Sequence, residues 1–373
     1  MPTIDYKLFF NNAPAKQDQL DSVESIEIEQ DVDMAWEARL EIPLCSSDSG
    51  KWAKEDDKVL ADFGRVRVEV KIGKDSFVPL IDGPIVGFDN TMSSEPGQSS
   101  LKLRIQDDSV LLNREETLAS FKDKTDDEIA EKIFKSIPEI PSVKRDSVPR
   151  PDAKLTPVEI QHGTGIQLLR ALAKRQHMHA YVLPGSKPGQ SVGMFKKYPT
   201  TKDGLPNMIL LGAGRNISKL EVKNQATKAG KTVGYAVSIT DKKTVKKTST
   251  FRRLDLLGSE KAEKSDKNTG TYFLPADLVD SVDLDAAVQA KTDAASYQFE
   301  ASGSLYTECY GKVLTPYRLV TVTGVNGRLS GDYVVIGVTH TLNRWSYRQA
   351  FKLLRNALSA GAGGGTGLLE KVF

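Results

Sequence analysis

The sequence contains little of the chemistry from which most active sites are built. It has four histidines and two cysteines among 373 residues, and no GxSxG, HExxH or P-loop pattern occurs. Cys45 and Cys309 lie far apart and lack CxxC spacing, so we expect buried, reduced thiols and neither a disulfide framework nor a zinc site. No apolar run approaches the roughly 20 residues of a membrane span. No basic segment followed by an apolar core marks a signal peptide, and we expect assembly in the cytoplasm.

The composition is that of a soluble protein with two or three domains. Hydrophobic residues make up 39% of the chain and charged residues 27%, and the length allows more than one core. The formal net charge of +2 does not indicate a class of partner.

Residues 1–115 alternate between apolar and polar side chains, which predicts half-buried antiparallel strands. The segment 80–92 contains Gly83 and Gly87, where a strand can bend or another backbone can approach closely. The apolar positions of the other strands are Ile4, Tyr6, Leu8, Phe10; Trp36, Ala38, Leu40, Ile42, Leu44; Val66, Val68, Val70, Ile72; and Leu101, Leu103, Ile105. We interpret this region as a first β-domain.

Residues 116–205 change to helical spacing. Thr125 and Glu128 form a capping box before a helix that we expect Pro138 to end. Thr164 and Gln167 open a second helix, which is followed by a strand. Its apolar stripe is Ile166, Leu169, Leu172 and Ala173. We interpret this region as a helical or mixed insertion.

Residues 206–358 predict a second β-domain, with strands at 208–211, 217–222 and 233–239. The polar segment 240–268 predicts a long loop. The alanine-rich segment 285–300, with Phe299 on its apolar face and Gly303 after it, predicts a helix. Three further strands form an antiparallel meander around Val320–Val325, Tyr333–Leu342 and Tyr347–Leu354. Residues 359–373 are a glycine-rich linker and an apolar tip.

Candidate binding and catalytic groups are few, and each has a structural explanation. Gly212–Asn216 has the composition of a phosphate loop, but strand spacing follows it, which favours a β-turn. His177 and His179 share a face of a strand without a third ligand, so we expect no metal site. The alternation around His340 predicts a hydrogen-bonded core histidine. Two acidic residues, Asp107 and Asp108, stand where a strand ends, and we assign no catalytic or cofactor-binding residue.

A cluster of basic residues runs through the first half of the second β-domain. Only Glu221 and Asp241 oppose it in that span. Nucleic-acid binding usually adds aromatic side chains, so a solvated loop or a face toward an acidic neighbour is favoured over it. We expect the segment Lys242–Arg253 to face a partner or a channel rather than a core. The basic residues are Lys219, Lys223, Lys228, Lys231, Lys242, Lys243, Lys246, Lys247, Arg252 and Arg253.

Three stretches resemble the late control protein D family, the baseplate hubs of contractile phage tails, which are related to the hub portion of VgrG. The C-terminal stretch is similar to the end of that family's sequences. It contains a glycine, a Y-x-V-x-x-V-x-H strand, a polar turn and a Y-x-x-x-F-x-L-x-R strand. Those residues are Gly331, Tyr333, Val335, Val338, His340, Tyr347, Phe351, Leu353 and Arg355. Asp108, Leu112 and Arg114 match its D-x-x-x-L-x-R strand exit. Gln161, Leu168, Leu169, Leu172 and Ala173 match its middle helix.

The resemblance implies an α+β, β-rich fold with two tube-like antiparallel β-barrel domains and a helical or mixed insertion between them. It implies a non-enzymatic homotrimer in the baseplate of a virion or contractile injection particle. The partners would be the tail tube protein, a separate central spike protein and baseplate wedge or sheath-proximal components, with no specific nucleic acid. The alternatives are a cell-envelope-acting enzyme, a carbohydrate-binding module, or a distal-tail or tube protein.

Overall fold

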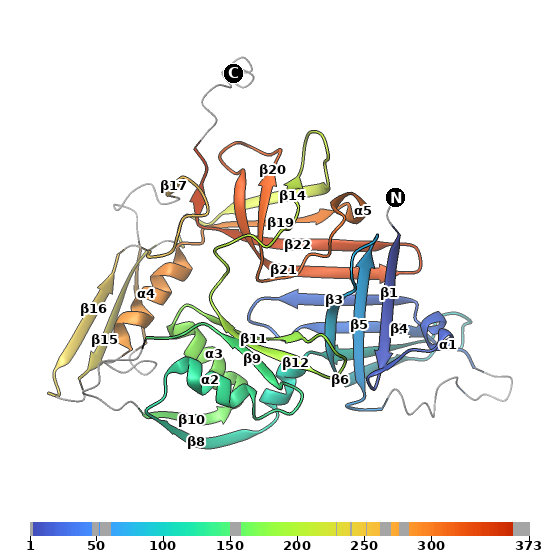
Figure 1. Cartoon of the computed structure of the whole chain (residues 1–373), viewed down its shortest axis with the longest axis horizontal. Coiled ribbons are helices and arrows are strands. Elements are labelled where there is room, and N and C mark those ends of the chain that lie inside the picture. The colour runs from blue at the N-terminus through green and yellow to red at the C-terminus, as the bar shows by residue number, and fades with distance from the viewer. Residues whose placement is uncertain are drawn as a thin grey trace, which may run out of the picture. The chain divides into compact units, whose positions relative to one another are not determined.

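A computed structural model describes residues 3–46, 52, 61–149, 158–228, 230–238, 241–250, 252–261, 270–275 and 283–360. The chain packs as two compact units (Figure 1). Unit 1 comprises Met1–Tyr198, Gly311–Pro316 and Ile336–Phe351. Unit 2 comprises Pro199–Tyr310, Tyr317–Val335 and Lys352–Phe373. The predicted β-rich α+β class is confirmed, since antiparallel strands dominate both units.

Unit 1 is built on an antiparallel sheet in which hydrogen-bonded neighbours run β21-β3-β4-β7-β6-β5-β1-β2. The alternation predicted for residues 1–115 is confirmed, because the apolar positions of β4 and β5 are buried. Strand β3, whose Ile26 and Ile28 are buried, is an addition to the predicted set. The elements are β1 (Ile4–Phe10), β2 (Ala13–Pro14), α1 (Gln17–Ser22), β3 (Ser25–Asp31), β4 (Glu37–Pro43), β5 (Arg65–Ile72), β6 (Val78–Thr91), β7 (Ser100–Gln106) and the 3-10 helix η2 (Asp108–Asn113).

Gly83 of β6 lies against the backbone at the end of β7. A Cβ atom there would stand 1.8 Å from the carbonyl oxygen of Gln106, so no other residue fits without moving the backbone. At Gly87 the register of the β6–β7 pair shifts, as at a β-bulge. Both glycines therefore have the roles that the sequence indicated.

The second part of unit 1 packs two helices against short strands around an apolar core. Both predicted capping boxes are present, at Thr125 and at Thr164. α2 ends at Phe134, before Pro138. After it Ser136 and Ile137 donate to carbonyl oxygens three residues earlier, so a 3-10-type turn rather than the α-helix leads to Pro138. The strands form a β8–β10 ribbon and a β11-β12-β9 sheet. The elements are β8 (Glu116–Lys122), α2 (Asp126–Phe134), β9 (Ser142–Arg145), β10 (Val158–Thr164), α3 (Gly165–Arg175), β11 (His179–Pro184) and β12 (Ser191–Lys196).

Unit 2 contains a sheet with the order β14-β19-β22-β21, which β20 and β13 extend. The predicted C-terminal meander is confirmed, and β21 and β22 contribute residues to both units. The elements are β13 (Met208–Ile209), β14 (Ile217–Asn224), β15 (Gly230–Val237), β16 (Thr244–Ser249), β17 (Glu260–Lys261), β18 (Gly270–Phe273), α4 (Leu284–Ala295), β19 (Phe299–Leu305), α5 (Thr307–Tyr310), β20 (Leu319–Thr323), β21 (Gly331–Asn343), β22 (Tyr347–Arg355) and β23 (Ala357–Leu358).

Two predictions for unit 2 are wrong. The segment 240–268 is not one long loop, because β16 pairs with β15 and β17 pairs with β23. β-Branched Thr244, Val245 and Thr248 favour a strand between the lysines. The alanine-rich helix ends at Ala295, and Phe299 begins β19, which pairs with β14. Tertiary pairing therefore overrides the helical spacing that reaches Phe299.

The predicted burial of the cysteines is also wrong. Cys45 and Cys309 are both exposed and free. Cys45 follows the end of β4, and Cys309 lies in the short helix α5. None of the described helices is long and apolar enough to cross a membrane.

Candidate functional site: buried polar networks

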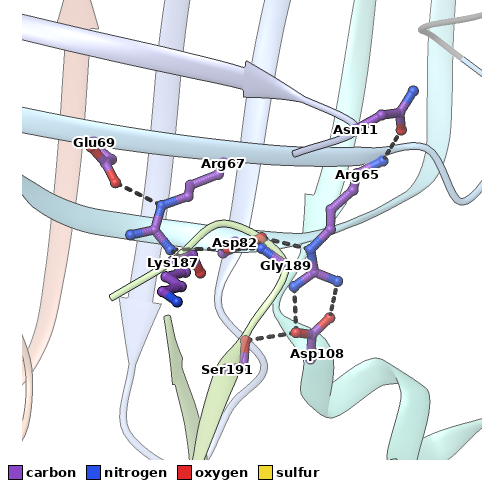
Figure 2. A network of polar contacts seen from close by, with 9 residues as sticks. All are labelled: Asn11, Arg65, Arg67, Glu69, Asp82, Asp108, Lys187, Gly189 and Ser191. Atoms are coloured by element: carbon purple, nitrogen blue, oxygen red, sulfur yellow. Dashed lines mark hydrogen bonds and ion pairs between the residues drawn. The ribbon is translucent and has the colours of Figure 1, made fainter. Parts of the chain in front are cut away.

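A buried network of ion pairs joins strands β5 and β6 of unit 1 to η2 (Figure 2). Arg65 donates from Nε to Asp82 at 2.7 Å. Its two terminal nitrogens donate to the two carboxylate oxygens of Asp108 at 2.9 and 2.5 Å. Arg67 donates to the other oxygen of Asp82 at 3.0 Å and to Glu69 at 2.7 Å. Asp82 thus bridges two arginines of β5 from the adjacent strand β6.

The same network holds the loop between β11 and β12. Gly189 donates its backbone N–H to Asp82 at 3.0 Å, and the Ser191 hydroxyl donates to Asp108 at 2.6 Å. Arg67 also donates to the carbonyl oxygen of Lys187 at 3.3 Å. The carboxylates therefore tie this loop to β6 and η2, which are elements of the first β-region. The network works as a clamp within unit 1 (Figure 2).

Burial controls the electrostatics of this clamp. Asp82 and Asp108 are fully buried and Arg67 is 2% exposed. Burial raises the pKa of Asp108, and its hydrogen bonds with Arg65 oppose that rise. Burial pulls the pKa of Arg65 down, but Asp108 and Asp82 outweigh it, so the pKa is raised and the guanidinium stays charged. Removing one member would leave an uncompensated buried charge, which is costly.

Asp107, beside the clamp, has a capping role. Its carboxylate accepts from the N–H of Ser109 at 2.8 Å, which caps η2, and from the N–H of Trp36 at 2.6 Å. Complete burial raises its pKa to about 6, against the opposing effect of these hydrogen bonds. The positions of Asp107 and Asp108 in a strand exit are therefore explained by capping and ion pairing.

His340 is the hydrogen-bonded core histidine that the sequence predicts. It is fully buried, with Nδ1 2.8 Å from the Tyr347 hydroxyl and Nε2 3.1 Å from Oε1 of Gln30. Burial lowers its pKa to about 3, so the ring is neutral at physiological pH. These bonds join β21, β22 and β3.

Arg355 organises the C-terminal end of unit 2. Its fully buried guanidinium donates to the carbonyl oxygen of Leu257 at 3.0 Å and to the Ser359 hydroxyl at 2.8 Å, and it lies 5.2 Å from the ring centre of Tyr333. A Cβ at Gly331, which has φ of +133°, would stand 2.5 Å from the same guanidinium. Three residues of the C-terminal pattern, Gly331, Tyr333 and Arg355, are therefore parts of one packing cluster.

The two neighbouring histidines are not arranged as a pair of ligands. The prediction that His177 and His179 share a face of one strand is wrong, because His177 lies in the turn before β11 with φ of +52°. His179 starts β11, with Nδ1 2.9 Å from Asp33 and its ring 4.0 Å from that of Tyr198. Among the described residues, no group of three or more His, Cys, Asp or Glu side chains could hold a metal ion.

The glycine-rich segment after β13 is a turn, as predicted. Gly212 and Gly214 have positive φ, and β14 rather than a helix follows. Asn216 closes the turn by accepting from the N–H of Ile209 at 2.7 Å and donating to the carbonyl oxygen of Asn207 at 2.9 Å.

Most of the basic cluster is exposed, whereas Lys228 and Arg252 are partly buried. Part of the cluster has acidic partners that are distant in sequence. Lys228 pairs with Glu300 at 3.1 Å. Lys247 lies 4.0 Å from Asp285 of α4. Lys242, Lys243 and Lys246 are exposed to solvent, so the expectation that these side chains avoid the core is confirmed.

No family model and no curated protein matches this sequence. Solved structures do match the fold. A tail protein from Neisseria meningitidis is 14% identical, with a TM-score of 0.63 over 94% of this chain and 97% of its own. A 43 kDa prophage tail protein from Shewanella oneidensis is 14% identical, with a TM-score of 0.65 over 95% and 100%. The E. coli c3393 protein, described as a type VI secretion component similar to phage T4 tail proteins gp27 and gp5, is 13% identical, with a TM-score of 0.52 over 90% and 73%.

The chain therefore has the fold of phage tail proteins and of a type VI secretion component. The buried clamp was not predicted from the sequence, because Arg65 and Arg67 occupy the polar positions of the alternation with Val66 and Val68, and such positions usually face solvent. The acidic residue in the apolar stretch Leu80–Ile81–Asp82 was the available signal.

Proposed function

We propose that this protein is a structural baseplate hub of a contractile phage tail or related injection system. The observation that carries the proposal is the extent of the match: the similarity covers nearly the whole of this chain and of two tail proteins. The hub would form a homotrimer of the late control protein D type and join the sixfold tail tube to the threefold central spike. Its two β-rich regions, 1–115 and 206–358, would act as the tube-like domains.

The buried polar groups support a structural role. The clamp, the His340 network and the Arg355 cluster all satisfy charged or polar side chains inside a unit. Such networks fix the positions of strands, which suits a part of a rigid particle. We accordingly propose that the protein is not an enzyme and needs no metal or cofactor.

Residues 368–373 carry the proposed contact with the spike. They include Leu368, Leu369, Val372 and Phe373 after a glycine-rich linker, and they lie outside the described residues. Burying each such side chain contributes about 1.5–3 kcal/mol, and ordering the backbone costs about 1–2 kcal/mol per residue. The two terms are similar in size, so we propose docking only where a partner supplies a groove that buries all four side chains.

Co-purification from cells expressing the spike, tube and hub genes of the same particle tests the proposal. Tagged full-length hub should recover both partners. Deleting residues 368–373 should reduce recovery of the spike and leave that of the tube unchanged. If the intact chain recovers neither partner, the hub proposal is wrong; if the deletion has no effect, the assignment of the tip alone is wrong.

The principal alternative is another tail component, such as a distal-tail or tube protein. A cell-envelope-acting enzyme or carbohydrate-binding module would need paired carboxylates in a cleft or exposed aromatics. Trp345 is 91% exposed, but it stands on a turn that Asn343 caps by accepting from Trp345 N–H and Ser346 N–H. Binding to purified envelope fractions would favour that alternative.

A further inference from the structure

The three-stranded sheet of β16, β15 and β18 in unit 2 presents two aromatic rings on one face. Tyr235 of β15 is 40% exposed and Phe273 of β18 is 66% exposed. Their ring centres are 6.5 Å apart and their planes differ by 14°. These stacked, exposed rings on adjacent strands form an apolar platform.

Cationic side chains border this platform. Lys246 pairs with Tyr235 across the β15–β16 ladder, and its ammonium lies 5.6 Å from the tyrosine ring centre. Lys231, also exposed, lies two positions before Val233, whose partner on β18 is Phe273. The described residues of this face include no carboxylate. The described residues whose side chains lie on this face are Lys231, Val233, Tyr235, Val237, Thr244, Lys246, Thr248, Thr271 and Phe273.

The opposite face of the sheet is the one that packs into a core. Helix α4 lies along β15 and β16 (Figure 1), and its Leu284 and Val288 come within 2.7 Å of the Cβ position of Gly234. Ala236 completes this small core with Val245 and Leu274. The platform is therefore the outer face, and intramolecular packing on α4 does not explain its rings.

We propose that this platform binds single-stranded nucleic acid without sequence specificity. Such sites combine aromatic rings, on which successive bases stack, with lysines that meet the phosphates. The basic cluster in the sequence had few aromatic neighbours, and it is the fold that places Phe273 of a separate strand beside Tyr235 and Lys246. A cationic, carboxylate-free face with exposed aromatic rings complements a polyanion with planar groups better than it does a neutral glycan or an acidic protein surface. The proposal is independent of the hub assignment.

Fluorescence anisotropy with the full-length protein and a labelled oligothymidylate strand tests the proposal at low and moderate salt. Tyr235→Leu and Phe273→Leu keep apolar volume and remove a ring, and each should weaken binding at least about fivefold, the lower end of what base stacking contributes. Lys246→Met should weaken binding and reduce its salt dependence. Duplex of the same length should bind less tightly.

Lys247→Met is the matched control, because Lys247 neighbours Lys246 in sequence but lies on the α4 side, 4.0 Å from Asp285. It should leave binding unchanged. Circular dichroism confirms that each variant is folded. The proposal is wrong if the protein does not bind the single strand, or if Lys246→Met and Lys247→Met have equal effects. It is also wrong if polyglutamate or an acidic polysaccharide binds more tightly than the oligonucleotide.

Discussion

Asp107 and His340 are two buried side chains of unit 1 whose pKa values are shifted in opposite directions. They therefore change the stability of the protein with pH in opposite directions. Burial raises the pKa of Asp107 from 3.8 to about 6, so its contribution is full below about pH 3.8 and is lost as the pH rises through about 6. Burial lowers the pKa of His340 from 6.5 to about 3, so its contribution is full above about pH 6.5 and is lost as the pH falls toward about 3.

Between about pH 4 and 6 both groups change the free energy of unfolding with pH, and their two slopes against pH have opposite signs. Each has a magnitude of about 1.4 kcal/mol per pH unit for one proton. Asp107→Asn should therefore make the free energy of unfolding fall more steeply on acidification than in the wild type, and His340→Gln should make it fall less. Urea unfolding at several pH values measures the slopes. Parallel pH profiles of the variants and the wild type would contradict these assignments.

Gly83 is the residue where one added methyl group has the clearest effect. A Cβ would overlap the carbonyl oxygen of Gln106 at 1.8 Å, so Gly83→Ala must displace the end of β7. We expect the free energy of unfolding to fall by about 1–3 kcal/mol, as for other overpacked sites. Gly270→Ala is the control, because a Cβ there has no neighbour within 4 Å among the residues that the structure describes. Equal midpoints of thermal unfolding for the two variants would refute the close approach.

Individual residues were predictable where local pattern and burial agree. His340 lies on the apolar side of its strand alternation, and the structure places it in the core with two partners. Arg67 follows the polar alternation of β5 yet is 2% exposed, because the loop 185–191 covers that face. Strand periodicity contains no information about a segment more than a hundred residues away, so the clamp required the fold.

At the scale of elements, the clamp should stabilise the β11–β12 loop. Asp82→Asn removes the charge that bridges Arg65 and Arg67, and breaking such a buried pair costs about 3–5 kcal/mol. Hydrogen exchange at Lys187–Ser191 should accelerate, since the N–H of Gly189 is bonded to Asp82. Arg39→Met is the control: it removes the surface ion pairs of Arg39 with Glu37 and Glu29, and each such pair is worth about 0–1 kcal/mol. Unchanged exchange in Asp82→Asn would show that the loop is held by other contacts.

Elements with their own start signals were predicted well, and those decided by pairing were not. The capping boxes at Thr125 and Thr164 locate α2 and α3. By contrast, β16 is a lysine-rich strand that gains its partner from β15, and Phe299 leaves the helical pattern because β14 pairs with β19. Pairing between strands decides both cases, with the preceding strand for β16 and with a strand distant in sequence for β19, and the periodicity of one segment does not contain it.

At the scale of the whole molecule, the sequence and the fold support the same class of protein. The C-terminal pattern that resembles the late control protein D family includes Gly331, Tyr333 and Arg355, which pack together around one buried guanidinium. The fold matches tail proteins over almost the full chain at 14% identity.

The proposed hub role requires self-association with threefold symmetry, and the native mass of the purified full-length protein tests this most directly. We predict a homotrimer, with a mass three times that of the 40.9-kDa chain, that persists on dilution. The Asp82→Asn protein serves to show whether assembly needs the intact clamp. A monomer at all concentrations, or a sixfold ring of the kind that a tube protein forms, would contradict the account.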